Sequence, residues 1–262
     1  MRRLFIKSLA IFLFFSLPVS VPALQQVKFI GEFSVGSPFG VAVDKDGRIY
    51  VTDKKGTVKV LKDGEVVLSW GGKSADKKWR LKRPAGIALY EDRVYITDSA
   101  LGKVFIFSKD GEYIDSFGSK GSKAKEFDTP HGIFVYGGVV YVADTGNRRV
   151  QVFGSNGVYI GSIGTKGECI MLLNKPTDVA VDHRGYVYVV DSKSKRVQVF
   201  KPSGKHYRNF TEFKNPVAIA ITEDGFFVAD RGSYKVKKYD FDGNLLLSFG
   251  MKGNGRAQFR AI

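Results

Sequence analysis

The chain has 262 residues, of which 41 are Lys or Arg and 26 are Asp or Glu, so its formal charge is +15. Apolar residues make up 44% and aromatic residues 13%, which excludes a disordered chain. A single cysteine excludes an internal disulfide framework and a cysteine-rich zinc site. The excess of positive charge indicates an anionic partner without identifying it.

The first 23 residues have the pattern of an export signal. Three cations precede an uncharged apolar stretch at 9–17, and the small-residue sequence VPA at 21–23 is a cleavage site. We therefore expect residues 1–23 to be a signal peptide and residues 24–262 to be the mature domain, located in the periplasm or outside the cell. The alternative is an uncleaved membrane anchor, for which the apolar stretch is short. No later stretch is apolar enough to span a membrane.

The rest of the chain is an internal repeat. Five segments align from a proline, and the prolines at 38, 84, 130, 176 and 216 are 46, 46, 46 and 40 residues apart. Each repeat holds four short runs rich in Val, Ile, Tyr and Phe, separated by glycine-containing turn sequences. In the third repeat the runs are 133–136, 139–143, 150–153 and 158–163. Four antiparallel strands in every repeat predict the blades of an all-β propeller, in which most of these apolar residues form the core.

The third repeat also has a finer pattern, PHGI at 130–133 followed by YVADTGNRRVQVF at 141–153. This pattern resembles the NHL repeat, and the resemblance extends from residue 38 to residue 250. It implies a propeller of four-stranded antiparallel blades. It says little about function, because one propeller fold hosts many functions.

The number of blades departs from the family pattern, since NHL propellers usually have six. The sequence predicts five complete blades preceded by a single strand at 28–35, and residues 259–262 align with 127–130, where a further repeat would begin. Three arrangements fit: a truncated six-bladed ancestor, a five-bladed ring with an extra strand, or an open ring. We favour the truncated ancestor; an open ring would expose strand edges that pair with other chains.

An Asp ends the second strand of every repeat, and in four repeats a cation follows five residues later. The aspartates are Asp53, Asp98, Asp144, Asp191 and Asp230, and the cations are Lys103, Arg149, Arg196 and Lys235. A ring of carboxylates could hold a metal. A short Asp that accepts backbone N–H bonds in a turn, with a cation balancing its charge, explains the repetition better.

The residue after each proline begins the innermost strand and is expected to line the central funnel. These residues are Phe39, Ala85, His131, Thr177 and Val217. The NHL-like family includes peptidyl-hydroxyglycine α-amidating lyases, whose zinc is held by histidines, some in a Pro-His-Gly setting like that of His131. One histidine cannot replace a multi-histidine zinc site. We therefore expect no catalytic residues, no metal and no cofactor, and we interpret His131 as a polar funnel-lining group.

Propeller topology places the blade-to-blade connections and the turns between second and third strands on one face. These segments hold most of the cations, whereas the opposite face is mildly acidic. We expect a binding face made of Lys73, Lys77, Lys78, Trp79, Arg80, Arg83, Arg148, Arg149, Lys193 and Arg231. Residues 73–83 are its densest part, in which Trp79 either stacks on a partner or pins the loop to the rim.

Three functions are compatible with these features. The favoured one is an exported, non-catalytic binding or scaffold module that recognises an anionic partner, which is a protein, an envelope polymer or a lipid headgroup. The alternative is an exported propeller enzyme of the lyase or lactonase type with a metal near His131. The third is RNA binding, which export disfavours.

Overall fold

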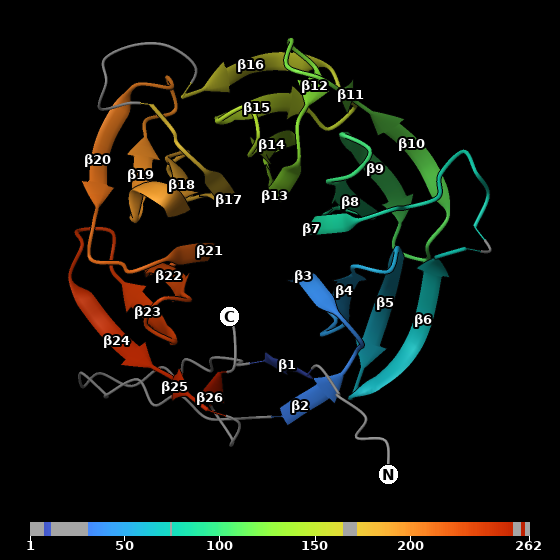
Figure 1. Ribbon diagram of the computed structural model, residues 1–262, viewed down its shortest axis with the longest axis horizontal. Helices are drawn as coiled ribbons and strands as arrows, with labels where there is room; N and C mark the ends of the chain where they lie inside the picture. The colour runs from blue at the N-terminus through green and yellow to red at the C-terminus, as the bar shows by residue number, and fades with distance from the viewer. Residues whose placement is uncertain (1–7, 12–30, 74, 165–171, 254–257, 260–262) are drawn as a thin grey trace.

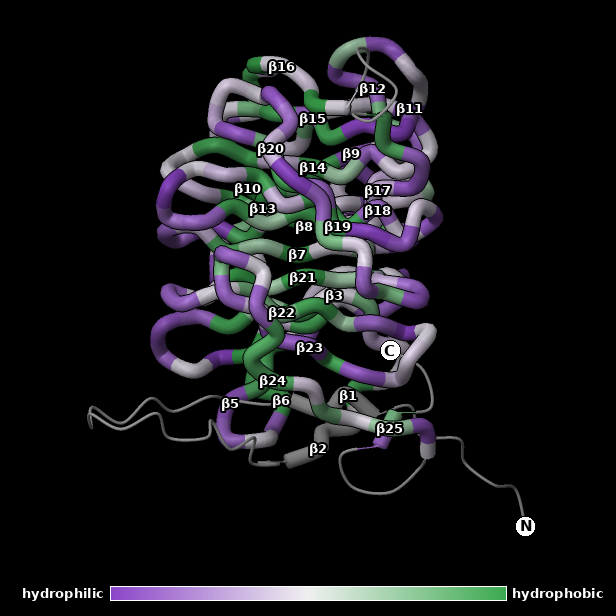
Figure 2. The backbone as a smooth tube through the Cα atoms, turned by 90° about the vertical axis from the view of Figure 1, so that its left-hand side faces the viewer, coloured by the Kyte–Doolittle hydropathy of each residue, from purple (hydrophilic) through white to green (hydrophobic). Residues whose placement is uncertain are grey.

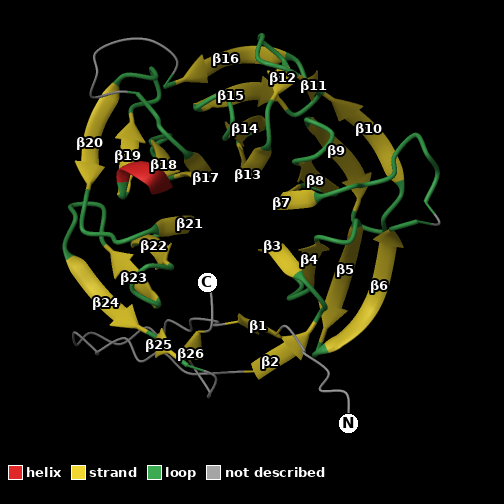
Figure 3. Cartoon of the chain, in the orientation of Figure 1, coloured by secondary structure: helices red, strands yellow, loops and turns green. Residues whose placement is uncertain are grey.

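The computed structural model describes residues 8–11, 31–73, 75–164, 172–253 and 258–259. These residues form five four-stranded antiparallel sheets that are arranged as blades around a ring (Figure 1). The predicted all-β propeller with five complete blades is confirmed. A short 3-10 helix, η2 (Ser192–Ser194), is the one helical element of the described residues (Figure 3).

Each blade is a meander of four strands that run from the centre of the ring to its edge. Blade 1 contains β3 (Pro38–Val43), β4 (Ile49–Asp53), β5 (Thr57–Lys62) and β6 (Glu65–Gly71). Blade 2 contains β7 (Pro84–Tyr90), β8 (Arg93–Asp98), β9 (Lys103–Ser108) and β10 (Tyr113–Phe117). Blade 3 contains β13 (Pro130–Tyr136), β14 (Val139–Asp144), β15 (Arg149–Gly154) and β16 (Tyr159–Ile163).

Blades 4 and 5 continue the same pattern. Blade 4 contains β17 (Pro176–Val181), β18 (Val187–Asp191), β19 (Arg196–Phe200) and β20 (His206–Phe210). Blade 5 contains β21 (Pro216–Thr222), β22 (Gly225–Asp230), β23 (Lys235–Tyr239) and β24 (Leu245–Phe249). The inner strands begin at the repeat proline, earlier than predicted, because each proline pairs with the Asp that ends the second strand.

Two small sheets lie between blades 5 and 1 (Figure 1). In one, β2 (Gly31–Ser34), which corresponds to the strand predicted at 28–35, pairs antiparallel with β1 (Ser8–Ile11). In the other, β25 (Met251–Lys252) pairs parallel with β26 (Gln258–Phe259), as β11 (Ser119–Lys120) pairs with β12 (Glu126–Phe127) after blade 2. Except for β1, the predicted signal peptide lies outside the described residues.

The inner strand of blade 1 has one side that no described blade covers. Val41 and Val43 on this side are 46% and 44% exposed, whereas Ile87, at the position of Val41 in the next repeat, is buried against blade 1. The side facing blade 2 carries the smaller Gly40 and Ala42, and Ala42 packs on the core. The exposed side therefore marks the surface that a preceding blade covers elsewhere in the ring.

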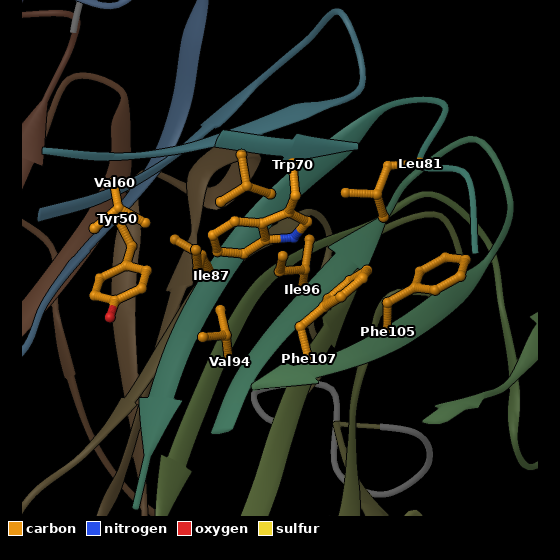
Figure 4. Close-up of a cluster of buried hydrophobic side chains, with 10 residues drawn as sticks. Tyr50, Val60, Trp70, Leu81, Ile87, Val94, Ile96, Phe105 and Phe107 are labelled. Atoms are coloured by element: carbon orange, nitrogen blue, oxygen red, sulfur yellow. The ribbon is translucent and has the colours of Figure 1, made fainter. Parts of the chain in front are cut away.

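Hydrophobic clusters between successive blades hold the ring together. Between blades 1 and 2, Tyr50, Trp70 and Ile87 pack with Phe107, and all four are less than one tenth exposed (Figure 4). Each buried side chain of this size contributes about 1.5–3 kcal/mol through its removal from water. The hydrophobic strands lie in the middle of the disc, and hydrophilic turns project at its two faces (Figure 2).

Side-chain hydrogen bonds to the next blade join the inner strands around the ring. Thr52 donates to the carbonyl of Ala85 at 2.6 Å, and Thr97 donates to the carbonyl of His131 at 2.5 Å. Thr145 donates to the carbonyl of Pro176 at 2.6 Å. Each of the first three blades thus fixes the starting position of the next blade's inner strand.

Close approach of the inner strands requires glycine where these links form. A Cβ on Gly86 would lie 2.4 Å from the carbonyl oxygen of His131. That distance is too short for any other residue unless the backbone moves, so the Pro-x-Gly pattern of the first three repeats follows from blade packing.

We predict that Thr52→Val lowers the free energy of unfolding by about 1–3 kcal/mol. Thr52 is fully buried, accepts from the N–H of Gly40 and donates to Ala85, so valine leaves both backbone groups without a partner. Urea unfolding of the variant measures the change. Thr211→Val, at an exposed position, is the control, and equal midpoints for the two variants would contradict the prediction.

Candidate functional site

The strand register gathers the functional positions on one face of the disc. In every blade the proline that begins the inner strand pairs with the Asp that ends the second strand, as Pro84 does with Asp98. The third strand begins beside that Asp, and the blade-to-blade connection arrives there. We call this side the proline face.

Buried aspartates hold the loops of the proline face in place. The carboxylate of Asp98 accepts the backbone N–H groups of Lys82 at 2.6 Å and Arg83 at 3.1 Å from the incoming connection. It also accepts two N–H groups from the turn that follows it. Asp191 likewise accepts from Lys175 at 2.8 Å. The five aspartates are at most 3% exposed, in agreement with the structural role predicted for them.

The cations predicted to balance these aspartates do so in blades 3 and 4. Arg149 contacts Asp144 at 2.8 Å, and Arg196 contacts Asp191 at 3.4 Å. In blade 5 the partner of Asp230 is Lys237 at 3.8 Å, not the predicted Lys235. Residues two apart lie on the same side of a strand, so Lys237 reaches the carboxylate from the next position along β23. For Lys103, no ion pair is found among the described residues.

Arg149 therefore belongs to the interior and leaves the predicted binding face. It is 8% exposed, and its guanidinium also donates to the carbonyls of Lys123 and Glu126. Burial raises the pKa of the Asp144 carboxyl, although hydrogen bonds from Asn147 and Arg149 favour the ionised form. Arg149 thus compensates a buried charge and joins the loop after blade 2 to blade 3.

We predict that Arg149→Ala lowers the free energy of unfolding by about 3 kcal/mol, because it leaves the Asp144 charge buried and unpaired. Arg148→Ala is the matched control, since the adjacent Arg148 is exposed. It should change stability by less than about 0.5 kcal/mol. Chemical denaturation of both variants provides the comparison, and equal losses would refute the assignment.

The remaining residues of the predicted binding face differ in exposure. Trp79 and Arg80 are half-buried, and Arg80 donates to the carbonyl of Ala75 at 2.8 Å within its own loop. The others are exposed: Lys73, Lys77, Lys78, Arg83, Arg148, Lys193 and Arg231.

Residues 73–83 do not form one patch on the proline face. The loop between β6 and β7 extends past the edge of blade 2 (Figure 1). There Trp79 packs edge-on against Phe107, with ring centroids 5.9 Å apart, and the Lys78 ammonium lies 5.5 Å from the ring of Tyr113. Both aromatic partners are at the end of blade 2 away from the proline face. Trp79 thus pins the loop to the rim, and Arg83 returns to the proline face.

Three of the predicted funnel-lining residues surround a cavity of about 140 Å³. Phe39, Ala85 and His131 from blades 1, 2 and 3 line it, and the Phe39 and His131 rings lie 5.5 Å apart. Its other lining residues are Lys54, Arg83, Pro84 and Ser99. Thr177 and Val217 follow the prolines that begin the inner strands of blades 4 and 5 and are not part of its lining.

Cations from three different connections and turns converge on His131. Burial, together with the charges of Lys175, Arg83 and Lys54, lowers the pKa of the imidazole to about 4. His131 is therefore neutral at pH 7. No ion pair among the described residues includes any of these three cations. The proline face thus carries positive charge around His131 that no described ion pair compensates.

A metal does not fit this set of neighbours. No three His, Cys, Asp or Glu side chains among the described residues gather as a metal site would require. His131 has ammonium and guanidinium groups around it, which repel a metal cation. The chemistry that this donor set favours is the binding of an anion.

Asp178 was not identified from the sequence. It occupies the position held by glycine in the first three repeats, and this break in the pattern is a signal that could have found it. Its carboxylate accepts the N–H of Val179 at 3.0 Å and, across to blade 5, the N–H of Ile219 at 2.9 Å. Asp178 thus takes the place of the threonine link at this blade junction. Burial raises the pKa of its carboxyl to about 7.

We predict that the His131 imidazole titrates near pH 4, well below its ordinary pKa. NMR titration measures this, and Lys175→Gln should raise the pKa whereas Arg148→Gln should not. Between about pH 4 and 6.5 the His131 imidazole is protonated in the unfolded chain but not in the folded chain. Compared with a His131→Phe variant, wild-type stability should therefore fall as the pH drops through this window. A wild-type midpoint near pH 6.5 would disprove the buried, positively charged environment of the imidazole.

Comparisons with known proteins agree with this architecture. A family model described as a 6-bladed beta-propeller matches residues 75–137, and the NHL repeat model matches residues 127–153 and 173–200. Among curated protein sequences, none matches the chain. The described residues include no helix of the length and apolarity needed to cross a membrane.

Similar solved structures are propellers of low sequence identity. Virginiamycin B lyase from Staphylococcus aureus is 15% identical with a TM-score of 0.62, covering 85% of this chain and 72% of that one. A chain of a nidogen/laminin complex is 19% identical with a TM-score of 0.66, covering 81% and 79%. A streptogramin B lyase is 12% identical with a TM-score of 0.64, covering 95% and 75%. At these identities the likeness concerns the fold alone. With its repeats, its four-stranded blades and the two matching family models, this chain is a β-propeller that contains NHL repeats.

Proposed function

We propose that the protein is a non-catalytic binding module that recognises an anionic partner through its proline face. The supporting observation is the cluster of Lys54, Arg83 and Lys175 around His131, which has no ion-pair partner among the described residues. Uncompensated cations held close together cost electrostatic free energy unless an anion binds, so they are typical of a recognition site.

The wider face continues this charge. Arg148 and Lys193, in the turns between second and third strands of blades 3 and 4, are exposed. The site therefore has a basic centre with further cations around it, which suits a partner larger than the cavity itself. A similar propeller fold in a nidogen/laminin complex supports a role in protein binding.

The partner is expected outside the cytoplasm. Residues 1–23 carry the export pattern, and we propose that this segment directs the chain to the periplasm or the extracellular space. There the anionic partner is a protein, an envelope polymer or a lipid headgroup. The lyase or lactonase alternative requires a metal near His131, and the cations around that residue argue against it.

Binding to immobilised poly-glutamate and to vesicles containing anionic lipid tests the proposal. We predict that one of these surfaces binds the protein at 0.1 M salt and that 0.5 M salt weakens the binding about tenfold or more, because screening shortens the range of the attraction. The two surfaces distinguish a protein-like acidic partner from a lipid surface. Binding that is unchanged by salt would overturn the electrostatic interpretation.

Charge-reversed variants locate the binding face. Arg148→Glu combined with Lys193→Glu should weaken binding about tenfold. Lys45→Glu combined with Lys205→Glu makes the same change of net charge in exposed turns of the opposite face and should have little effect. Equal effects of the two double variants would mean that net charge, and not the proline face, directs binding.

A further inference from the structure

The hydrogen bonds around His131 define its tautomer. The hydroxyl of Thr145 donates its single proton to the carbonyl of Pro176 at 2.6 Å. The same oxygen lies 3.2 Å from Nδ1 of His131, so it must accept there, and Nδ1 carries the proton. Nε2 of the neutral ring is then a hydrogen-bond acceptor, and it has no partner among the described residues.

The cavity therefore combines an acceptor with two cations. His131, Lys54 and Arg83 all line it, and burial with the neighbouring charges keeps the imidazole neutral at pH 7. A ligand that satisfies all three groups carries a negative charge and a hydrogen-bond donor on adjoining atoms. A fully deprotonated anion such as sulfate has no proton to donate to Nε2, and a neutral amide has no charge for Arg83.

Phe39 adds an apolar wall to the same cavity. Its side chain is 47% exposed, the Lys54 ammonium lies 5.2 Å from its ring centroid, and the His131 ring lies 5.5 Å away on centroids. An exposed aromatic ring between a cation and an acceptor favours a ligand with an apolar group beside its polar ones. A volume of about 140 Å³ suits one residue-sized group, not a polymer segment.

We propose that this cavity binds the carboxylate end of an N-acylated amino acid, as found at the C-terminus of a peptide. The carboxylate contacts Arg83 and Lys54, the adjoining amide N–H donates to Nε2 of His131, and the side chain packs on Phe39. The inference deepens the proposed function, because it names the group that the centre of the proline face recognises. It rests on the proposed function only in taking the proline face as the binding face.

Calorimetric titration at pH 7 with four small probes tests the assignment. N-acetyl-leucine offers charge, donor and apolar group. N-acetyl-leucinamide lacks the charge, 4-methylpentanoate lacks the N–H, and hydrogen phosphate lacks the apolar group. We expect N-acetyl-leucine to bind about tenfold more tightly than each of the others, since each of them loses one charged, hydrogen-bonded or apolar contact.

Variants assign the contacts to residues. Arg83→Gln should weaken the binding of N-acetyl-leucine and of 4-methylpentanoate about tenfold, and Lys54→Gln should also weaken it. His131→Phe should remove the preference for N-acetyl-leucine over 4-methylpentanoate while carboxylate binding remains. Lys205→Gln, at an exposed cation in a turn of the opposite face and outside the cavity lining, is the control. Thermal unfolding verifies that each variant is folded, and the ¹⁵N shift of Nε2 in wild type should move when N-acetyl-leucine binds.

Several results would overturn the proposal. They are equal binding of the acid and its amide, equal or tighter binding of hydrogen phosphate, loss of binding in Lys205→Gln as large as in Arg83→Gln, and no binding of N-acetyl-leucine up to about 10 mM. These probes are small, so their failure leaves surface binding to poly-glutamate or vesicles intact. Loss of surface binding with retained N-acetyl-leucine binding would instead reject the proposed function and keep the cavity.

Discussion

The buried aspartate at the end of each second strand is the interaction on which the proline face depends. A carboxylate that is removed from water must be compensated, and here the compensation comes from backbone N–H groups of the incoming connection. Asp98 holds the backbone of Arg83, and Asp191 holds that of Lys175. The same hydrogen bonds that stabilise the loops therefore fix the backbone positions from which these two cationic side chains extend. Without them the long side chains would have no common anchor point at the funnel.

The blade junctions achieve one geometry with different residues. Thr52 and Thr97 lie near the end of a second strand and donate hydrogen bonds to the inner strand of the next blade. Asp178 instead lies on an inner strand and accepts a hydrogen bond from blade 5. Thr145 makes the third link and at the same time orients His131. A structural hydrogen bond at this junction thus sets the tautomer of the one histidine in the funnel. The hydroxyl oxygen of Thr145 takes part in both the blade junction and the cavity, which couples the stability of the ring to the chemistry of the cavity.

Sequence periodicity predicted the strands well and the side-chain partners less well. Four apolar runs and a terminal Asp occur in every repeat, so the five blades and the structural aspartates could be predicted from the sequence. Arg148 and Arg149 illustrate the limit: they are adjacent cations in one turn, but only Arg149 turns inward to Asp144. Trp79 illustrates it too, because the aromatic surface that holds it belongs to β9, more than twenty residues later.

The sequence by itself determined the repeat, the strand order and the identity of the proline face, because each of these follows from patterns within about 46 residues. Only the tertiary structure decided that Lys54, Arg83 and Lys175 meet at His131. The three cations lie in separate turns and connections of the first and third repeats, and their distances depend on how the blades curve around the ring. The loop at 73–83 shows the same dependence, since burial of Trp79 against blade 2 draws its lysines away from the funnel. Local pattern specifies what each blade contains, whereas convergence between blades is set by packing.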